Sequence, residues 1–527
     1  MVVVAVLPGC WVEITVPEGG YVTGGSPAYF CDSGQSCEIE FSETGVSANF
    51  RAVPWDGWIF MRWRKDWKHL CGGSQESCDL STDNDFLLAA FPAITELIES
   101  GEKFFLQPVF VRGTPIDTAL AAVPDPELRA CLQFVIDDIR DVQYAEELPR
   151  LECGSVRSLQ GLDAFVGLEH LQLDDFENES IDLSPLQALV RLHTLAIIGN
   201  SDDDTLEDTS HLAEQLIPLT RLKSLDLSRN GIQNLAPLAA PLAQMKRLTR
   251  LNLWGNNISD LGALAELKQL TSLNLLGNQI DNLEPLAALT KLQYLELSGN
   301  SISDLGPLVS LTQLQTLNII GSPLNDIRPL QALEQLQFLN LSGGSIRDLT
   351  PLANLKQMEV LRMRNNEITN LDALAGLNRL TWLDLAGNAI DDIGGLAGLS
   401  RMDSLYLSSN AISDLGPLMG LTSLQELDLS QNEIVDVGPL AGLINLQELD
   451  LSGNAIADIS PLSDLGQLEL LFLTDNEISE IRNLTESFSA ETRILLTGNP
   501  LSCAEIDALL NSDDVFVVYD PLPEGCS

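Results

Sequence analysis

The chain has 527 residues, of which 75 are acidic and 29 are lysine or arginine, so its formal net charge is −46. A surface this negative repels phosphate backbones and excludes nucleic acid as an expected partner. No run of about 18 apolar residues occurs, so the sequence contains no candidate transmembrane helix.

Residues 1–10 have the character of a targeting segment. The stretch Val2 to Cys10, VVVAVLPGC, is an apolar run that ends in Leu-Pro-Gly-Cys, and it resembles a bacterial lipobox. The resemblance implies that Cys10 is lipidated and becomes a membrane anchor. Trp11, not Asp, follows the cysteine, which in lipoproteins implies sorting to the outer membrane. We therefore expect an exported protein, an outer-membrane lipoprotein or cell-surface protein, that meets the membrane only through this lipid.

Residues 11–114 differ in composition from the rest of the chain, because they hold five of its seven tryptophans. Alternating runs bounded by turn residues predict strands at Trp11–Val16, Cys37–Phe41, Val46–Val53 and Trp58–Trp63. The order Cys31…Cys37…Gly57-Trp58-x-Phe60-x-x-Trp63…Cys71…Cys78 resembles extracellular β-repeat modules. The resemblance implies a small, disulfide-stapled all-β domain that serves as a spacer or an adhesive module. Most of the tryptophans are expected to fill its core, although a ligand platform is the alternative.

The nine cysteines indicate an oxidising compartment. Once Cys10 is set aside for lipidation, eight remain, and proximity in the sequence favours pairing between neighbours. The expected disulfides are Cys31–Cys37, Cys71–Cys78, Cys131–Cys153 and Cys503–Cys526.

Residues 115–153 are expected to form a linker and an N-terminal cap helix. Asp125-Pro126-Glu127 supplies an N-cap, a proline at the first helical position and an acid in the first turn. Apolar residues from Leu128 to Ile139 follow at helical spacing. Residues 500–527 are expected to form a second cap. Such caps cover leucines that have no neighbouring coil.

Between these caps the chain repeats itself every 22 residues. Asparagine occupies nine of eleven equivalent positions from Asn256 to Asn476, and the exceptions are Ser322 and Gly344. One unit, Leu449–Leu462, reads LDLSGNAIADISPL. Its alternating leucines predict a short strand, its asparagine a turn whose backbone groups the amide satisfies, and its remaining residues a 3₁₀ turn.

This unit resembles the leucine-rich repeat of bacterial internalin-like proteins, and it extends over residues 154–499. The resemblance implies an α/β solenoid, a right-handed horseshoe with a concave parallel β-sheet and a convex side of 3₁₀ and irregular structure. The first coils are longer, with steps of 30 residues from Asn200 to Asn230 and 26 from Asn230 to Asn256. We expect the extra residues, including Ser201–Asp204, to bulge outward.

The sequence contains no pattern typical of catalysis. The four histidines lack H-E-x-x-H spacing, and neither G-x-S-x-G nor a phosphate-binding G-x-x-x-x-G-K-[ST] motif occurs. We therefore expect no enzymatic activity, no cofactor and no metal site.

The positions two, four and six residues before each repeat asparagine are left free by the core and are expected on the concave face. Large aromatic and arginine side chains are frequent there, as they are in interface hot spots. The alternative is that bulky residues occur because strands favour them. The expected ligand-binding residues are Arg250, Trp254, Tyr294, Phe338, Arg362, Arg364, Trp382 and Tyr406.

An acidic patch is expected beside them, formed by Glu426, Asp428, Glu448 and Asp450. Strands lie about 4.8 Å apart, so these carboxylates should cluster, either as a screened acidic surface or as a docking patch for a basic segment of a partner. Ca²⁺ is a weaker candidate for this patch, because strand side chains rarely surround an ion with six ligands. The sequence thus predicts a non-enzymatic recognition module of the cell envelope that binds a protein or glycan. The alternative is a structural spacer or adhesion scaffold without a specific ligand.

Overall fold

The computed structural model describes residues 2–5, 10–24, 29–41, 47–64, 78–81, 104–139, 142–176, 182–200, 209–480, 492–510 and 516–518. The chain divides into two compact units. The first comprises Met1–Leu151 with Gln160–Leu168, and the second comprises Glu152–Leu159 with Glu169–Ser527.

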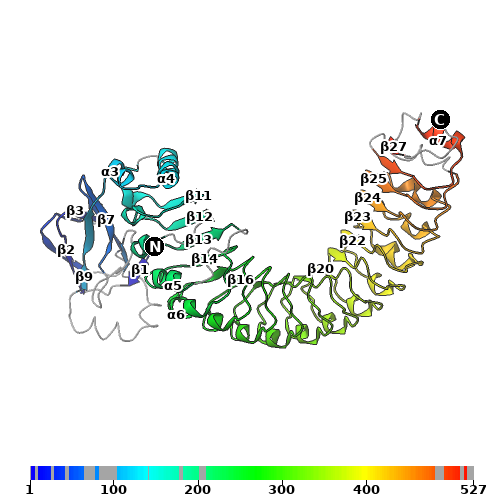
Figure 1. Cartoon of the computed structure of the whole chain (residues 1–527), viewed down its shortest axis with the longest axis horizontal. Coiled ribbons are helices and arrows are strands. Elements are labelled where there is room, and N and C mark those ends of the chain that lie inside the picture. The colour runs from blue at the N-terminus through cyan, green and yellow to red at the C-terminus, as the bar shows by residue number, and fades with distance from the viewer. Residues whose placement is uncertain are drawn as a thin grey trace. The chain divides into compact units, whose positions relative to one another are not determined.

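The first unit contains three small β-sheets (Figure 1). The five-stranded sheet has the order β1 (Val2–Ala5), β8 (Cys78–Ser81), β6 (Ser47–Pro54), β3 (Gly20–Gly24), β4 (Tyr29–Cys31). The three-stranded sheet has the order β5 (Ser36–Phe41), β2 (Cys10–Thr15), β9 (Phe104–Leu106). The two-stranded sheet pairs β10 (Pro108–Arg112) with β7 (Trp58–Trp63).

The core of these sheets is apolar and includes a fully buried tryptophan. Val12, Phe50, Trp63 and Leu106 are all 0 % exposed. Trp58 lies partly buried against this core, with the Arg112 guanidinium 5.5 Å from its ring centroid. Trp63 is thus a core residue, as expected for most of the tryptophans, whereas Trp55 is 43 % exposed.

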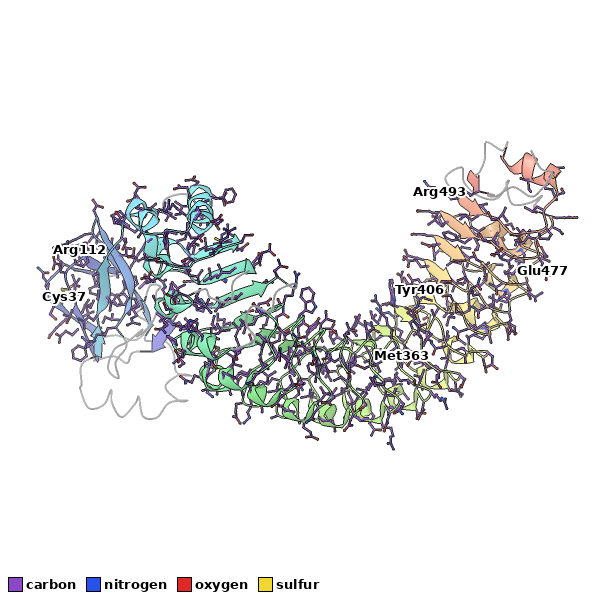
Figure 2. All side chains as sticks on the ribbon, viewed as in Figure 1. Cys37, Arg112, Met363, Tyr406, Glu477 and Arg493 are labelled. Carbon is purple, nitrogen blue, oxygen red and sulfur yellow. A yellow bond between two sulfur atoms is a disulfide. The ribbon has the colours of Figure 1, made fainter. Side chains whose placement is uncertain are left out.

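Disulfides occur in both units. Cys31 and Cys37 are bonded in the β region (Figure 2). Cys131, Cys153 and Cys503 are also in disulfide bonds. Cys71, Cys526 and the side chains of Cys10 and Cys78 lie outside the described residues, so the remaining expected pairs stay predictions.

Two helices follow the β-sheets, α3 (Ile116–Ala121) and α4 (Pro126–Asp138). The Asp125 carboxylate accepts a hydrogen bond of 2.8 Å from the Leu128 N–H, and Pro126 begins the helix, as the sequence predicts. Leu128 and Leu132 are 0 % exposed. This is the face that the apolar spacing predicts to be buried.

The second unit is built on one 17-stranded sheet ordered β11 to β27, in which β12 to β27 pair in parallel. Its strands are β11 (Arg150–Gly154), β12 (His170–Phe176), β13 (Thr194–Gly199), β14 (Ser224–Asp226), β15 (Arg250–Asn252), β16 (Ser272–Asn274), β17 (Tyr294–Glu296), β18 (Thr316–Asn318), β19 (Phe338–Asn340), β20 (Val360–Arg362), β21 (Trp382–Asp384), β22 (Ser404–Tyr406), β23 (Glu426–Asp428), β24 (Glu448–Asp450), β25 (Leu470–Phe472), β26 (Arg493–Leu495) and β27 (Phe516–Val518).

The repeat explains this architecture. From β12 to β25, a leucine in each strand pairs with a leucine in the next, for example Leu427 with Leu449, and both are at most 1 % exposed. The strands line the concave side of the curved coils, and short 3₁₀ turns such as Gly262–Leu264 and Ser460–Asp464 form the convex side (Figure 1). The expected leucine-rich-repeat solenoid is confirmed.

The longer coils contain two helices that the sequence did not predict, α5 (Ser210–Leu216) and α6 (Ala239–Gln244), in which Leu212, Leu216 and Leu242 are buried. A 22-residue coil has room only for a 3₁₀ turn, whereas additional residues complete a turn of α-helix. Ser201–Asp204 lies outside the described residues. Helix α7 (Cys503–Leu510) follows the last repeat asparagine.

The repeat asparagines form a ladder from coil to coil. Asn278 donates from Nδ2 to the carbonyls of Leu253 and Leu275, each at 3.0 Å, and its Oδ1 accepts from the Ile258 N–H at 3.0 Å. The same three bonds recur at Asn388, Asn410 and Asn432. Each asparagine therefore satisfies buried backbone groups of two coils.

The ladder is interrupted at Ser322 and Gly344. Ser322 contributes one hydroxyl bond of 3.3 Å to the Asn300 carbonyl. The next residue is Pro323, which lacks the N–H that Gln279 donates to the Ile258 carbonyl at the equivalent junction. The junction between the Asn300 coil and the Ser322 coil therefore has fewer hydrogen bonds than the junctions that an asparagine closes.

Candidate functional site

The concave sheet presents rows of outward side chains on the face opposite the buried leucines. Strand register sets these rows, because the residues that flank each central leucine lie beside their equivalents on the next strand. One row contains Phe338, Val360, Trp382, Ser404, Glu426 and Glu448, and the adjacent row contains Asn340, Arg362, Asp384, Tyr406, Asp428 and Asp450. These rows hold most of the sequence-predicted site residues.

Four of these side chains form a continuous contact that we call the aromatic–arginine ridge: Phe338, Arg362, Trp382 and Tyr406. The Arg362 guanidinium lies 5.6 Å from the Phe338 ring centroid and 5.2 Å from that of Trp382. The rings of Trp382 and Tyr406 are 5.1 Å apart. Cation–π and aromatic contacts thus order four large side chains over strands β19 to β22.

Two polar groups of the ridge are distinctive. The Trp382 Nε1 is buried and has no hydrogen-bond partner among the described residues. The Tyr406 hydroxyl donates a hydrogen bond to the Glu426 carboxylate, and Tyr406 lies on the strand side of its coil (Figure 2). Burial, followed by this contact, raises the pKa of the Tyr406 phenol. The ridge therefore runs directly into the acidic patch, whose four residues are Glu426, Asp428, Glu448 and Asp450.

Register brings the acidic patch together as predicted. Glu426 pairs with Glu448, and Asp428 pairs with Asp450, on adjacent strands. Burial and then the neighbouring carboxylates raise the pKa of Glu448. Burial also raises the pKa of Asp450, with a smaller contribution from Asp428. Negative charge is therefore costly at this position.

The two aspartates also have a local structural role that the sequence reasoning missed. Asp428 Oδ1 accepts from the Ser430 N–H at 3.0 Å, and Asp450 Oδ1 accepts from the Ser452 N–H at 2.8 Å. Equivalent bonds are made by Asp226, Asn252, Asn274, Glu296, Asn340 and Asp384. The recurrence of a side-chain acceptor four residues before the asparagine was the signal for this bond. Glu426 and Glu448 occupy a row without this role.

The other predicted residues lie on the same sheet, outside the four-residue stack of the ridge. Trp254, 39 % exposed, lies beside Arg229, whose guanidinium is 5.8 Å from the ring centroid. Tyr294 is also 39 % exposed, and Arg250 and Arg364 are exposed. Arg229 was missed because it lies at the turn, with φ of 60°, rather than in an outward strand position.

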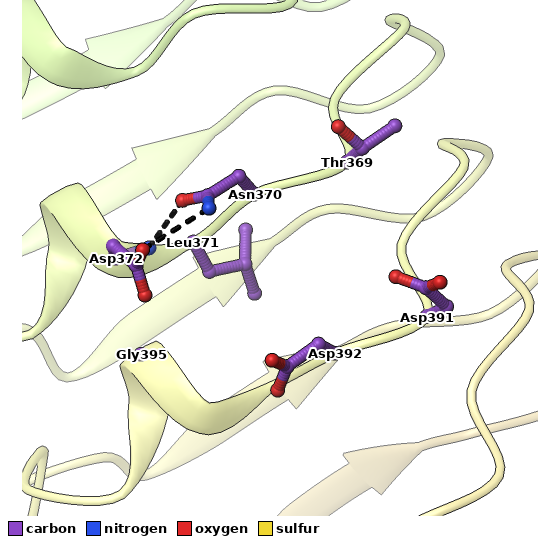
Figure 3. A pocket seen from close by; sticks show the side chains of 7 residues that line it. All are labelled: Thr369, Asn370, Leu371, Asp372, Asp391, Asp392 and Gly395. Carbon is purple, nitrogen blue, oxygen red and sulfur yellow. Dashed lines mark hydrogen bonds between the residues drawn. The ribbon is translucent and has the colours of Figure 1, made fainter.

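A separate pocket of about 400 Å³ lies on the loop side of two coils (Figure 3). Two of its polar side chains already accept hydrogen bonds from the backbone of their own turns. Asn370 Oδ1 accepts from the Asp372 N–H at 2.8 Å, and Asp392 Oδ1 accepts from the Gly394 N–H at 2.7 Å. A Cβ at Gly395 would lie 2.2 Å from the Leu371 carbonyl oxygen, so close packing of the coils requires glycine here. These contacts indicate that turn geometry shapes the pocket.

The described ranges contain no group of three or more histidine, cysteine, aspartate or glutamate side chains that could hold a metal ion. Among the helices in these ranges, none is long and apolar enough to cross a membrane.

Comparison with known families identifies the repeat. A family model described as leucine-rich repeats (2 copies) matches residues 246–288, 290–332, 400–442, 422–464 and 444–486, and a leucine-rich-repeat model matches residues 334–390. No curated protein matches the chain.

Solved structures extend this likeness. A leucine-rich-repeat protein of Leptospira interrogans is 20% identical with a TM-score of 0.57, and the match covers 69% of this chain and 87% of that one. The functional domain of InlJ from Listeria monocytogenes is 22% identical with a TM-score of 0.56, over 73% and 82% of the two chains. Both show the same fold.

An internalin of Listeria monocytogenes, InlF, is more similar in sequence. It is 30% identical with a TM-score of 0.53, and the match covers 68% of this chain and 96% of that one. Since the likeness includes nearly the whole of that internalin, the chain belongs to the internalin-like leucine-rich-repeat proteins.

Proposed function

We propose that the protein is a non-enzymatic recognition module that binds a protein partner through its concave sheet, with the aromatic–arginine ridge at the centre of the contact. Leucine-rich-repeat proteins of this kind generally mediate protein–protein recognition. The location of the contact and the chemistry of the partner are our inference.

The observation that carries the proposal is the ordered stack of Phe338, Arg362, Trp382 and Tyr406. These side chains lie on the face of the sheet opposite the core, because they alternate along the strands with buried leucines such as Leu361 and Leu383. Tryptophan, tyrosine and arginine are the residues most enriched in hot spots. Because their mutual contacts restrict their conformations before binding, less entropy is lost when a partner docks.

The acidic patch narrows the partner to one that carries a basic segment next to an apolar surface. Glu448 and Asp450 have raised pKa values because burial and like charges disfavour their ionised forms. A lysine or arginine from a partner would relieve this repulsion. We further propose that the protein is exported and that Cys10 carries a lipid that holds it at the cell envelope.

A comparative cross-linking experiment tests the ridge. The double variant Trp382→Ala/Tyr406→Ala should lose a protein that the wild type captures from envelope extracts. The matched control Val309→Ala/Met419→Ala removes two apolar side chains, 46 % and 63 % exposed, from the convex turns and should retain it. Unchanged melting temperatures establish that both variants fold. Equal capture by all three proteins would contradict the proposal and favour a spacer role.

The acidic patch is tested on that same purified partner. Changing Glu426 and Glu448 to Gln and Asp428 and Asp450 to Asn should slow association and flatten its dependence on salt. Association that keeps its rate and its salt dependence would remove the patch from the contact.

A further inference from the structure

One segment of the second unit, residues 215–259, carries a local excess of positive charge, although the coils before it are acidic. Residues 215–259 contain six lysines and arginines and a single acid, Asp226, whereas the whole chain has 29 basic and 75 acidic residues. The basic residues are concentrated where strands β13 to β15 begin. We call this surface the basic edge, and it consists of Arg191, His193, Arg221, Lys223, Arg247 and Arg250.

Backbone hydrogen bonds fix the spacing of the basic edge. The His193 N–H donates to the Glu169 carbonyl at 2.7 Å, the Lys223 N–H to the His193 carbonyl at 2.8 Å, and the Thr249 N–H to the Lys223 carbonyl at 2.9 Å. Glu169, His193 and Lys223 therefore occupy the same place in consecutive coils. Lys223, Arg247 and Arg250 are exposed, so these three cations are accessible and follow the spacing of the strands.

The chain itself shows how this edge receives a carboxylate. Glu169 lies 3.5 Å from the Arg191 guanidinium and 3.7 Å from His193 Nδ1, so one acid is held by an arginine and an imidazole of the next coil. The two following coils repeat the cations at the same positions, Arg221 with Lys223 and then Arg247. The position of Glu169, however, is taken by His193 and then by Lys223.

The electrostatics of His193 agree with this crowding of cations. Burial is the largest cause that lowers its pKa, and Lys223, Arg221 and His170 lower it further, whereas Glu169 opposes them. Since like charges raise one another's free energy, a bound anion would be stabilised here. An anion must approach these cations closely to be attracted, because salt screens charges beyond a Debye length of about 8 Å at physiological ionic strength.

We propose that the basic edge binds an acidic segment of the protein partner, whose aspartate and glutamate side chains continue the Glu169 pattern along Lys223, Arg247 and Arg250. This inference rests on the proposed function and adds an orientation to it. The partner places its acidic segment against strands β13 to β15 and its basic segment against the acidic patch of β23 and β24. Charge complementarity at both ends of one sheet would exclude the reversed orientation.

The test uses a fluorescent peptide of about ten glutamates as the probe and fluorescence anisotropy of the full chain at low salt. The net charge of −46 repels this probe overall, so binding must come from a local surface. Wild type should bind it, and Lys223→Gln/Arg247→Gln/Arg250→Gln should bind at least about tenfold more weakly. The control Lys268→Gln/Lys291→Gln/Lys356→Gln removes the same charge from other exposed sites and should change affinity less than about twofold.

Two further variants keep the result interpretable. Lys223→Arg/Arg247→Lys/Arg250→Lys retains the charges and should retain binding. Trp382→Ala/Tyr406→Ala should bind the glutamate probe like wild type, so a failure of the ridge is distinguished from a failure of the basic edge. Equal losses in the basic-edge and control variants, or no loss in either, would overturn the proposal. So would a sulfated glycan or an oligonucleotide that binds the edge more tightly than the peptide.

Discussion

At the scale of single residues, the repeat asparagine is the side chain on which the coils depend most. Asn278 is 8 % exposed, and its carboxamide bonds backbone groups at Leu253, Leu275 and Ile258. Asn278→Ala leaves these groups without partners and should cost about 2–3 kcal/mol. Urea denaturation measures this loss, with the exposed neighbour Gln279→Ala as the control. A loss no larger than that of the control would contradict the role of the carboxamide.

The acidic patch makes a prediction about pH. The folded-state pKa of Glu448 is raised, so the folded state holds this proton more tightly than the unfolded state. Its contribution to stability is complete below the unfolded pKa and is lost as pH rises through the folded value. Glu448→Gln should therefore raise the melting temperature at pH 7, and the gain should vanish near pH 3.5. Calorimetry at the two pH values decides this, and a gain of equal size at both would contradict it.

Asp326 serves as a control, because its pKa is shifted in the opposite direction from that of Glu448. Its contact with Arg328 lowers the pKa of the carboxyl to about 2. Stability from this group is present above the unfolded pKa and is lost as pH falls through about 2. Asp326→Asn should accordingly lower the melting temperature slightly at pH 7, and the difference should disappear in strong acid.

Residues of the candidate site were predictable in position but not in contact. The 22-residue period places Phe338, Arg362, Trp382 and Tyr406 on one face, because side chains in a strand alternate between its two faces. The contacts among them depend on the rotamers of side chains on neighbouring strands, and the 22-residue period does not determine these rotamers. The partnership of Trp254 with Arg229 depends in addition on a turn residue with positive φ.

At the scale of elements, the interruption of the ladder predicts where the solenoid opens first. The junction into the Ser322 coil lacks an asparagine carboxamide and, at Pro323, a backbone donor. Coils couple only to their neighbours, so weakness there is not compensated from afar. Hydrogen exchange should be faster for amides in residues 302–344 than in residues 388–432. Ser322→Asn should slow exchange at the Ile302 amide, and uniform exchange along the coils would contradict this.

Gly344 does not offer the same repair. A Cβ at this position would lie 2.9 Å from both the Leu324 carbonyl oxygen and Asn366 Oδ1. The neighbouring coil has closed over the missing side chain, so a substitution would displace backbone. Gly344→Asn is therefore a useful contrast to Ser322→Asn, because it should destabilise the junction.

Elements were predictable where local sequence determines them. The strand predicted at Trp58–Trp63 has those bounds, and Asp125-Pro126 begins a helix as expected. The helices α5 and α6 were not predicted, because excess length in a coil indicates that the convex side changes without indicating how. Their helical form depends on burial of Leu212, Leu216 and Leu242, which only the tertiary structure reveals.

At the scale of the whole molecule, the net charge of −46 should make stability depend on salt. Exposed ion pairs such as Lys268–Glu266 contribute little, whereas mutual repulsion of the excess acids acts throughout the surface. Raising sodium chloride from about 0.02 M to 0.5 M shortens the Debye length several-fold and should raise the melting temperature. A scanning calorimetry series measures the trend, and a fall would mean that the ion pairs dominate.

The uninterrupted register from Asn366 to Asn476 has an evolutionary consequence. Every junction in this stretch is closed by the same asparagine bonds, so an unequal crossing-over that duplicates or deletes one unit joins coils that already fit. A unit gained between β22 and β23 would shift the acidic patch relative to the ridge by one strand spacing, about 4.8 Å. Changes in the number of repeats within the gene can thus alter the length of the ligand-binding surface, with no loss of fold at any intermediate step.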